Sequence, residues 1–531
     1  MVGGRHPDMA ADKRQILVCI NCRSRKKKCD KRLPSCGYCV QKRLKCAYSR
    51  GTTHRQDDPF GTPERNEAVV PEQIGLSSIL GTVLSGSEKL EISVHAEVNR
   101  LIRSTGQFVD DITARYFKDV HIFLPVIARS RFHNGLINLG APPSADLSIL
   151  LLCMCLVTPG PESRNSSSSK TSQHTIYLSA RSIFAQLQVM ISPSVSLVQA
   201  GLLLAVYEYV HGQSDRGLAT ISNSARMAYA ARIHTLNVNL RHEERTSRSL
   251  QPEEREALNT WWALIIWERC VRFLQLRLRR LAHIAADISA FDTDSSFFVF
   301  FRTMMLEVNT QDQPLITSVR PENAALPTEP ESIDQGDPMF SNTPVPKILV
   351  PSPHEGNVGG FGRLAQAIML VDQILKAFSI CDVAARLSAL HNINTSLQSF
   401  LGMVVKQHSG KPSSYCSAVV IAIRSLLSLH GHIIQLTSAE IAGGDNHADN
   451  TNSFAAIRTG ITMTLDIAEW HEARPPHMGL MLPPNYVYLL RATLSHMELG
   501  SLFEDEHQAQ DSRKCLERSL VKFGRLWGTA G

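Results

Sequence analysis

Six of the twelve cysteines in this 531-residue chain lie in one short stretch near its beginning. They fall in two consecutive halves of three cysteines with the same spacing. In each half, two residues separate the first and second cysteine, and six residues separate the second and third. The six positions are Cys19, Cys22, Cys29, Cys36, Cys39 and Cys46. Thiolates at this density in a lysine-rich segment indicate a metal site, and zinc is the first candidate because it favours sulfur ligands.

The number of cysteines limits how zinc can bind. A structural zinc ion takes four ligands, so two ions need eight ligand positions, and no histidine lies between Cys19 and Cys46. The count is met if two thiolates each bind both ions, and the repeat indicates Cys19 and Cys36, the first cysteine of each half. The first zinc would be bound by Cys19, Cys22, Cys29 and Cys36, and the second by Cys36, Cys39, Cys46 and Cys19.

A disulfide framework is the alternative use of six cysteines. The chain begins without an apolar signal segment, so we expect an intracellular and reducing environment, which disfavours disulfides. RING, LIM and PHD modules also bind two zinc ions, but they use eight ligands and longer gaps. The spacing therefore favours a compact cluster of two zinc ions with six thiolates.

The residues around these cysteines resemble a known family. The run from Cys22 to Asp30, followed by Pro34-Ser35-Cys36, is similar to the fungal binuclear zinc cluster (Zn2Cys6) DNA-binding domain. All six cysteines match, as do the basic run and the loop proline. The resemblance covers roughly residues 15–50 and implies two short helices, each opening at a cysteine pair, joined by a loop that turns at Pro34.

Positive charge is concentrated at the same end of the chain. Residues 1–50 contain 14 Lys and Arg against 3 Asp, a net charge of +11. The whole chain carries +6, so the remaining residues carry −5. This asymmetry is typical of a module that binds nucleic acid.

The resemblance also implies how this module contacts DNA. In the family, the end of the first helix enters the major groove over a CGG-type triplet. By position, Lys26 would donate to guanine O6 and N7, with Arg25 beside it. Arg23, Lys27 and Lys28 would meet phosphates, which set affinity and register but not sequence. The alternative interpretation of this basic run is that it forms only a solvated surface or serves only as a nuclear import signal.

The rest of the chain is predicted to be helical. Residues 51–89 form a polar, proline-containing linker, and residues 1–14 a disordered arm. From residue 90, apolar residues recur every three or four positions. Val94, Val98, Leu101, Phe108 and Ile112 give a brief heptad-like rhythm, but Thr105 and Gly106 interrupt it, which favours a packed surface helix over a coiled coil.

Two further segments resemble the fungal-specific regulatory domain that follows many zinc clusters. They are Tyr116–Pro125 and Glu253–Trp262; the match fails just after Arg269 and resumes near Leu326. The resemblance implies a regulatory domain, which the helical periodicity places over residues 90–308 and 361–531. The many prolines of residues 309–360 predict a disordered insert between these two parts.

Composition and periodicity assign several parts of this domain. Leu147–Val157 is typical of a buried helix, residues 196–209 and 219–233 of paired helices, and residues 159–169 of a surface loop. Trp261, Trp262 and Trp267 are expected in the core, with a ligand cage as the alternative. The six remaining cysteines are expected to be small buried apolar residues: Cys153, Cys155, Cys270, Cys381, Cys416 and Cys515.

The sequence thus predicts a mostly α protein: a small cluster domain with two zinc ions and six cysteines, followed by a large all-α regulatory domain. We expect a nuclear, sequence-specific transcription factor for RNA polymerase II genes, such as the regulator of a pathway or secondary-metabolite cluster. Expected partners are double-stranded DNA, a second copy of the chain, transcription machinery or a corepressor, and a small-molecule effector, with no membrane. A corepressor-recruiting repressor is one alternative, and an enzyme fused to a DNA-binding arm is another, although no catalytic motif supports it.

Overall fold

The computed structural model divides the chain into two compact units, Met1–Gln73 and Ile74–Gly531. We call them the cluster unit and the helical unit. The structure describes residues 19, 22, 27–32, 35–42, 87–137, 141–158, 167–235, 251–288, 315–318, 324–330, 333, 358–408, 412–439, 447–473, 482–497 and 506–529. Among these residues the regular elements are all helices, which confirms the predicted mostly α fold.

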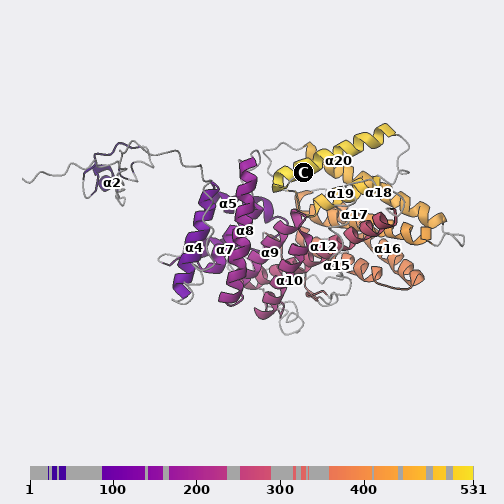
Figure 1. Ribbon diagram of the computed structural model, residues 1–531, viewed down its shortest axis with the longest axis horizontal. Helices are drawn as coiled ribbons and strands as arrows, with labels where there is room; N and C mark the ends of the chain where they lie inside the picture. The colour runs from indigo at the N-terminus through magenta and orange to yellow at the C-terminus, as the bar shows by residue number, and fades with distance from the viewer. Residues whose placement is uncertain are drawn as a thin grey trace, which may run out of the picture. The chain divides into compact units, whose positions relative to one another are not determined.

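The first half of the helical unit is a group of helices packed around two buried ones, α7 and α9 (Figure 1). In chain order they are α4 (Ser87–Ser104), α5 (Val109–Arg115), the π-helix η1 (Tyr116–Val120), α6 (Arg129–Leu136), α7 (Ala145–Val157), α8 (Ser167–Met190), α9 (Val195–Val210) and α10 (Ser214–Ala230). Helix α7 is apolar on every side and almost wholly buried, as predicted for its core position. Helices α9 and α10 pack together as the predicted pair.

Helix α4 ends where the heptad-like rhythm is interrupted. Val94, Val98 and Leu101 are buried against the domain, whereas Phe108 is 73% exposed. Gly106 lies between them with φ of +72°, a left-handed conformation that glycine adopts without strain. The prediction of a packed surface helix is therefore confirmed for α4, and dimerisation through a coiled coil stays untested.

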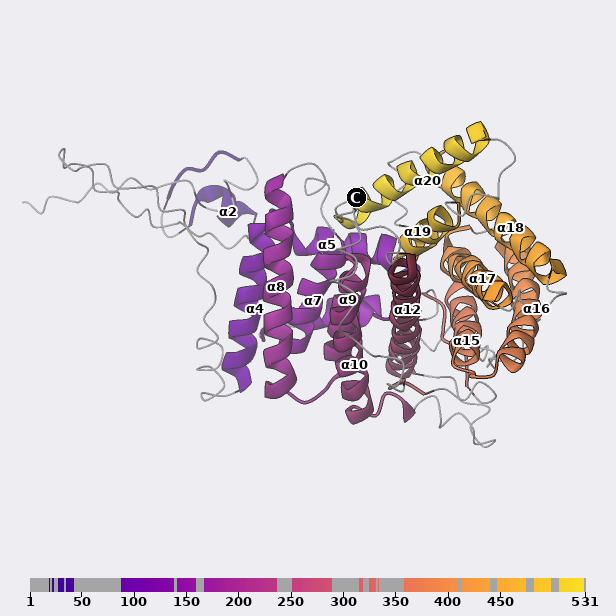
Figure 2. The same cartoon turned by 45° about the vertical axis from the view of Figure 1, so that its right-hand side comes forward.

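The second half of the helical unit is a further group of helices (Figure 2). It comprises α12 (Pro252–Ile288), α15 (Gly360–Phe378), α16 (Val383–His408), α17 (Pro412–Ala439), α18 (His447–Glu472), α19 (Tyr486–Met497) and α20 (Glu506–Trp527). Helix α12 packs on α9 and α10 on one side and on α15 on the other, so it joins the two halves. The three predicted core tryptophans, Trp261, Trp262 and Trp267, are all buried on it.

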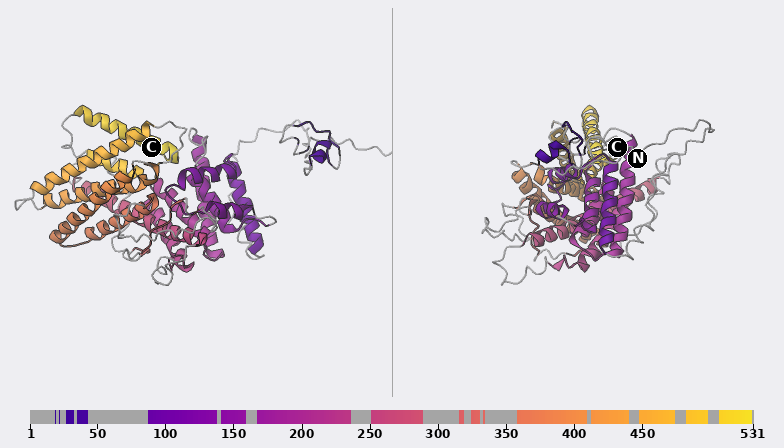
Figure 3. Two further views of the ribbon diagram at one scale, coloured as in Figure 1. Left: turned by 180° about the vertical axis from the view of Figure 1, so that it is seen from behind. Right: turned by 90° about the vertical axis from the view of Figure 1, so that its left-hand side faces the viewer.

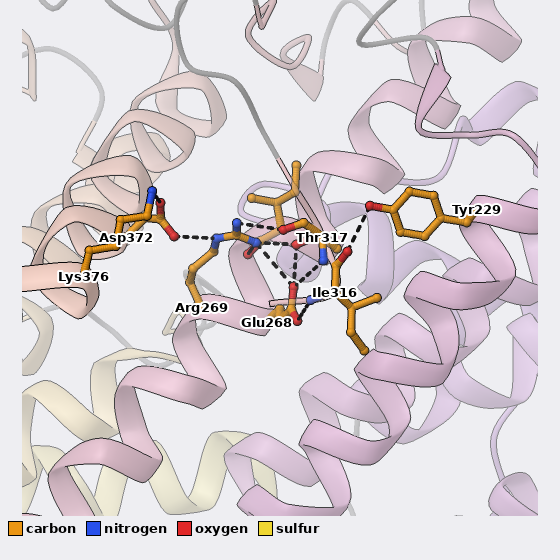
Figure 4. Close-up of polar contacts among 8 residues, drawn as sticks. Tyr229, Glu268, Arg269, Ile316, Thr317, Asp372 and Lys376 are labelled. Carbon is orange, nitrogen blue, oxygen red and sulfur yellow. Dashed lines mark hydrogen bonds and ion pairs between the residues drawn. The ribbon is translucent and has the colours of Figure 1, made fainter. Parts of the chain in front are cut away.

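Two buried polar residues of α12 bind an extended segment at residues 315–318 (Figure 4). The Glu268 carboxylate accepts hydrogen bonds from the backbone N–H of Ile316 at 2.7 Å and of Thr317 at 2.9 Å. The Arg269 guanidinium donates to the Thr317 carbonyl at 2.9 Å and pairs with Asp372 on α15 at 3.5 Å. These contacts give buried backbone groups the partners that a helix or sheet would otherwise supply.

A second segment, residues 324–330, is bound nearer the start of α12. The Asn259 side chain accepts from the Thr328 N–H at 2.8 Å and donates to the Thr328 carbonyl at 2.7 Å. The Trp262 indole N–H donates to the Ala325 carbonyl at 2.8 Å. Residues 315–318 and 324–330 fall inside the region expected to be a disordered insert, and that expectation does not hold for them because they are packed on α12.

Two other expectations need correction. The sequence predicts Ser167, Ser168 and Ser169 in a surface loop, but they form the first turn of α8. It predicts a buried Cys381, but this residue is exposed in the short connection between α15 and α16. The other five cysteines of the helical unit are buried as predicted.

The chain's last helix returns to the first half of the domain. Helix α20 packs on α18 and α19 (Figure 3). At its end, the Trp527 ring lies 6.2 Å from the Phe123 ring, and its N–H donates to the Leu482 carbonyl at 2.9 Å. Helix α20 ends in a Schellman motif. The N–H of Thr529 donates to the Gly524 carbonyl, and Gly528 adopts the left-handed conformation that this motif needs.

One described helical stretch, Tyr415–Thr437 within α17, is long and apolar enough to cross a membrane by length and composition alone. Of its most apolar window, 78% is buried inside the domain, as in the core helix of a folded protein. Helix α17 accordingly packs against α15, α16, α18 and α19.

Close packing of α9 predicts the effect of a substitution at Gly201. A Cβ there would overlap Ser224 Oγ and lie 2.5 Å from Phe184 Cζ. We expect Gly201→Ala to lower the free energy of unfolding by about 1–3 kcal/mol. The added methyl group forces the side chains of Phe184 on α8 and Ser224 on α10 to shift away from α9. The control, Gly402→Ala on α16, places its Cβ in open space and should be neutral or stabilising by up to about 1 kcal/mol. Thermal unfolding followed by circular dichroism measures both, and equal melting temperatures would contradict the close contact.

Candidate metal centre

Four of the predicted metal ligands lie together at the centre of the cluster unit. Cys19, Cys22, Cys36 and Cys39 are fully buried, and their sulfur atoms all lie within 4.8 Å of one another. Cys29 packs against this group and forms a second one with Asp30 and Cys36. Cys46, the sixth predicted ligand, lies outside the described residues.

The sulfur–sulfur distances fit a zinc–thiolate site. Cys36 Sγ lies 3.6 Å from both Cys19 Sγ and Cys22 Sγ, and Cys19 Sγ lies 3.8 Å from Cys39 Sγ. Thiolates about 2.3 Å from a tetrahedral zinc ion stand about 3.8 Å apart, so these sulfurs are spaced as ligands. The assignment of Cys19 and Cys36 as the bridging pair stays a prediction.

The protonation of the thiols depends on their surroundings. A hydrogen bond from the backbone of Cys19, helped by one from Lys31, lowers the pKa of the Cys29 thiol to about 6. Burial raises the pKa of the Cys22 thiol well above its usual range, and the neighbouring Cys19 and Cys36 add to the rise. Bound zinc supplies the positive charge that keeps such thiols deprotonated, so metal binding and folding of this unit are coupled.

Asp30 is a structural residue of the site that the sequence interpretation overlooked. Its carboxylate accepts from the Gly37 N–H at 3.0 and 3.1 Å, at the start of helix α2 (Gly37–Gln41). A Cβ on residue 37 would lie 2.8 Å from the Asp30 carboxylate, so glycine allows this approach. The signal was present in the sequence as an Asp directly after the third cysteine and a Gly directly after the fourth.

The predicted helix openings agree with the structure where it describes them. Cys36 precedes α2 and its carbonyl accepts from the Val40 N–H at 3.0 Å. Cys22 is helical, and its carbonyl accepts from the Lys27 N–H at 2.9 Å. Lys27 and Lys28 are exposed. The other predicted DNA contacts, Arg23, Arg25 and Lys26, and the loop residue Pro34 lie outside the described residues.

Protein-family models match a part of each unit. Residues 17–55 match the family model of the Fungal Zn(2)-Cys(6) binuclear cluster domain. Residues 113–322 match that of the Fungal specific transcription factor domain, which therefore includes the bound segment at 315–318. No solved structure matches the chain.

Two curated proteins are similar to parts of the chain. Transcription factor BOA15 of Botryotinia fuckeliana is 31% identical over 127 residues, which is 24% of this chain and 68% of that protein. Oleate activated transcription factor 3 of Kluyveromyces lactis is 36% identical over 64 residues, which is 12% of this chain and 10% of that protein.

The shared position of Cys36 leads to a metal-binding prediction. We expect Cys36→Ala to reduce the zinc content of the purified chain from about two ions to fewer than one and to unfold the cluster unit, because both ions lose a ligand. Atomic absorption gives the zinc content. Cys381→Ala, which removes an exposed thiol far along the sequence, is the matched control and should keep both ions. A Cys36→Ala protein that still holds two zinc ions would show that Cys36 is not a bridge.

Proposed function

We propose that this chain, which belongs to the fungal Zn2Cys6 transcription factors with a fungal-specific regulatory domain, recognises CGG-type triplets in DNA. The residues proposed to contact the bases are Lys26 and Arg25. The chain is a transcription regulator whose binuclear zinc cluster domain binds DNA. The finer assignment of triplet and contact residues is our inference from the positions of the basic residues.

The observation that carries the proposal is the zinc-ligand spacing of the four sulfurs directly beside a basic run. Cys22 and Cys29 bracket Arg23, Arg25, Lys26, Lys27 and Lys28, so folding of the cluster holds five cations on one short stretch. Fixed cations lose less conformational freedom when they bind phosphate and bases than cations on a mobile chain. The net charge of +11 on residues 1–50 adds long-range attraction for DNA.

Roles within the basic run are divided by position. Lys26 and Arg25 would donate to O6 and N7 of guanine in the major groove, which gives sequence preference. Arg23, Lys27 and Lys28 would neutralise phosphates, which gives affinity that falls with salt. The exposed side chains of Lys27 and Lys28 are available for such contacts.

The helical unit would carry regulation. Members of this family are generally nuclear, and we propose that this chain acts in the nucleus on RNA polymerase II genes of one pathway or secondary-metabolite cluster. We also propose that it binds DNA as a homodimer and that its helical unit responds to a small-molecule effector and contacts transcription machinery or a corepressor. Fusing residues 74–531 to a foreign DNA-binding domain in a reporter assay would separate an activator from a repressor.

Transcription factors are not an enzyme class, and we propose that the chain has no catalytic activity of its own. In support of this proposal, several buried histidines and carboxylates of the helical unit are engaged in hydrogen bonds within the protein. His430 hydrogen-bonds Ser453 and Asn394, for example, and Glu256 hydrogen-bonds Arg131 and the Ala128 N–H.

Selection from a random DNA pool tests the triplet. We expect the full chain with zinc to enrich CGG-type triplets and the same chain stripped by a chelator to enrich none, because the apo cluster does not fold. Two triplets at a fixed spacing would support the homodimer, and single triplets would contradict it. Zinc-dependent binding without any enriched triplet would overturn the proposed base contacts.

A pair of lysine substitutions separates base reading from phosphate binding. We expect Lys26→Ala to cost about 1–3 kcal/mol at the CGG site and to relax the preference for that triplet. Lys28→Ala should instead weaken binding to all sequences alike and reduce the salt slope by about 1. Titrations on matched and mismatched duplexes at several salt concentrations measure both effects. If Lys26→Ala weakens all sequences equally, Lys26 is a phosphate contact.

A further inference from the structure

Two arginines lie fully buried in the second half of the helical unit, and they differ in their surroundings. Arg363 on α15 donates from Nε to Gln407 at 2.9 Å and from Nη1 to Gln366 at 2.8 Å. Arg424 on α17 is also 0% exposed, but its Nε and Nη2 make no hydrogen bond. Its Nη1 donates to the hydroxyl of Tyr209 on α9 at 3.3 Å.

Aromatic rings surround Arg424. Its guanidinium carbon lies 4.6 Å from the centre of the Phe273 ring and 5.5 Å from that of the Tyr488 ring. The Tyr209 ring in turn lies 4.6 Å from Tyr488 and 5.3 Å from Trp267. Such rings attract a cation through their faces, but they supply no negative charge.

The cysteine and tyrosine side chains around Arg424 are neutral near pH 7, and in the described part of the chain the one further charged group on these rings is the exposed cation Arg491, 5.8 Å from the centre of the Tyr488 ring. Burial raises the pKa of the Cys270 thiol to about 12 and that of the Tyr488 phenol to about 12. Burial also holds the pKa of Tyr209 well above its usual range. Among the described residues, no carboxylate forms an ion pair with Arg424, so the charge of the guanidinium is not balanced there.

The two unbonded nitrogens lie on one edge of the guanidinium. Nε–H and the nearer N–H of Nη2 point the same way, and this edge matches the two oxygens of a carboxylate. A planar carboxylate with one negative charge would satisfy both donors and balance the single buried cation. A phosphate dianion would leave charge unbalanced among the surrounding rings, which is unfavourable in an apolar environment.

We propose that the unbonded edge of Arg424 anchors a small organic carboxylate, and that Phe273, Tyr209 and Tyr488 move apart to admit its apolar or aromatic body. The residues of this site come from α9, α12, α17 and α19, so a bound molecule would contact both halves of the helical unit. The guanidinium is sealed from solvent, so the molecule reaches it through a local opening of these helices. The inference rests on the proposed effector and gives it a chemical class, and its test needs no DNA, so it stands or falls separately from DNA recognition.

Thermal unfolding of the full chain tests the site. All five tryptophans, Trp261, Trp262, Trp267, Trp470 and Trp527, lie in the helical unit, so tryptophan fluorescence reports on this unit alone. The probes are sodium benzoate and sodium octanoate, each compared with its uncharged amide at the same concentration and ionic strength. We expect at least one carboxylate to raise the melting temperature by about 1–3 °C and the amides to have no effect.

The variant Arg424→Met removes the charge at similar volume, and Arg363→Met is the matched control. We expect Arg424→Met to unfold at or above the wild-type temperature without ligand and to lose the carboxylate-induced shift, because the unbalanced charge is gone. Arg363→Met should unfold at a lower temperature, because Gln366 and Gln407 lose their partner, and should keep the shift.

Three outcomes would overturn the proposal. One is that neither carboxylate raises the melting temperature of the wild-type chain. Another is that the shift persists in Arg424→Met, which would place the anion on another basic surface. The third is that Arg424→Met is destabilised as much as Arg363→Met, which would make Arg424 a structural residue held by its aromatic contacts.

Discussion

The hydrogen bonds from buried polar side chains of α12 to the backbone of two segments hold the helical unit together. Glu268 and Arg269 bind residues 315–318, and Asn259 and Trp262 bind residues 324–330. Peptide groups buried away from water need partners, and these side chains supply them where the segments form no regular helix of their own. Because α12 also packs on α9, α10 and α15, the same helix positions both halves of the domain.

The described part of the cluster unit has almost no hydrophobic core. Among its described residues the buried cluster consists of cysteines with Tyr38 beside them, so apolar burial contributes little to its stability. Metal–thiolate bonds take the place of a hydrophobic core, and the free energy of zinc binding becomes free energy of folding. The basic residues between Cys22 and Cys29 are therefore adjacent in sequence to a unit whose folding needs zinc.

Three buried charged side chains of the helical unit differ in the partners that surround them. Arg269 is paired with Asp372 and binds Thr317, and burial lowers the pKa of its guanidinium while Asp372 opposes that effect. Glu208 is paired with Arg181 at 2.6 Å and accepts from Tyr177 and Thr220. Arg424 has a tyrosine hydroxyl and ring faces only among the described residues. Networks whose members are satisfied stabilise a fold, whereas an unbalanced charge is usually retained for another reason.

Local patterns in the sequence were sufficient for the grouping of the five described cysteines of the cluster unit, the mostly α fold, the buried helix α7, the pair α9 and α10, and the three core tryptophans. Each rests on spacing or periodicity over a few turns, where the chain's own geometry decides which side chains share a face. The tertiary structure alone decided that residues 315–318 and 324–330 are bound, that Cys381 is exposed, and that Arg424 lies beside a tyrosine 215 positions away. These properties depend on contacts between distant segments, which proline content or apolar character in a short window cannot reveal.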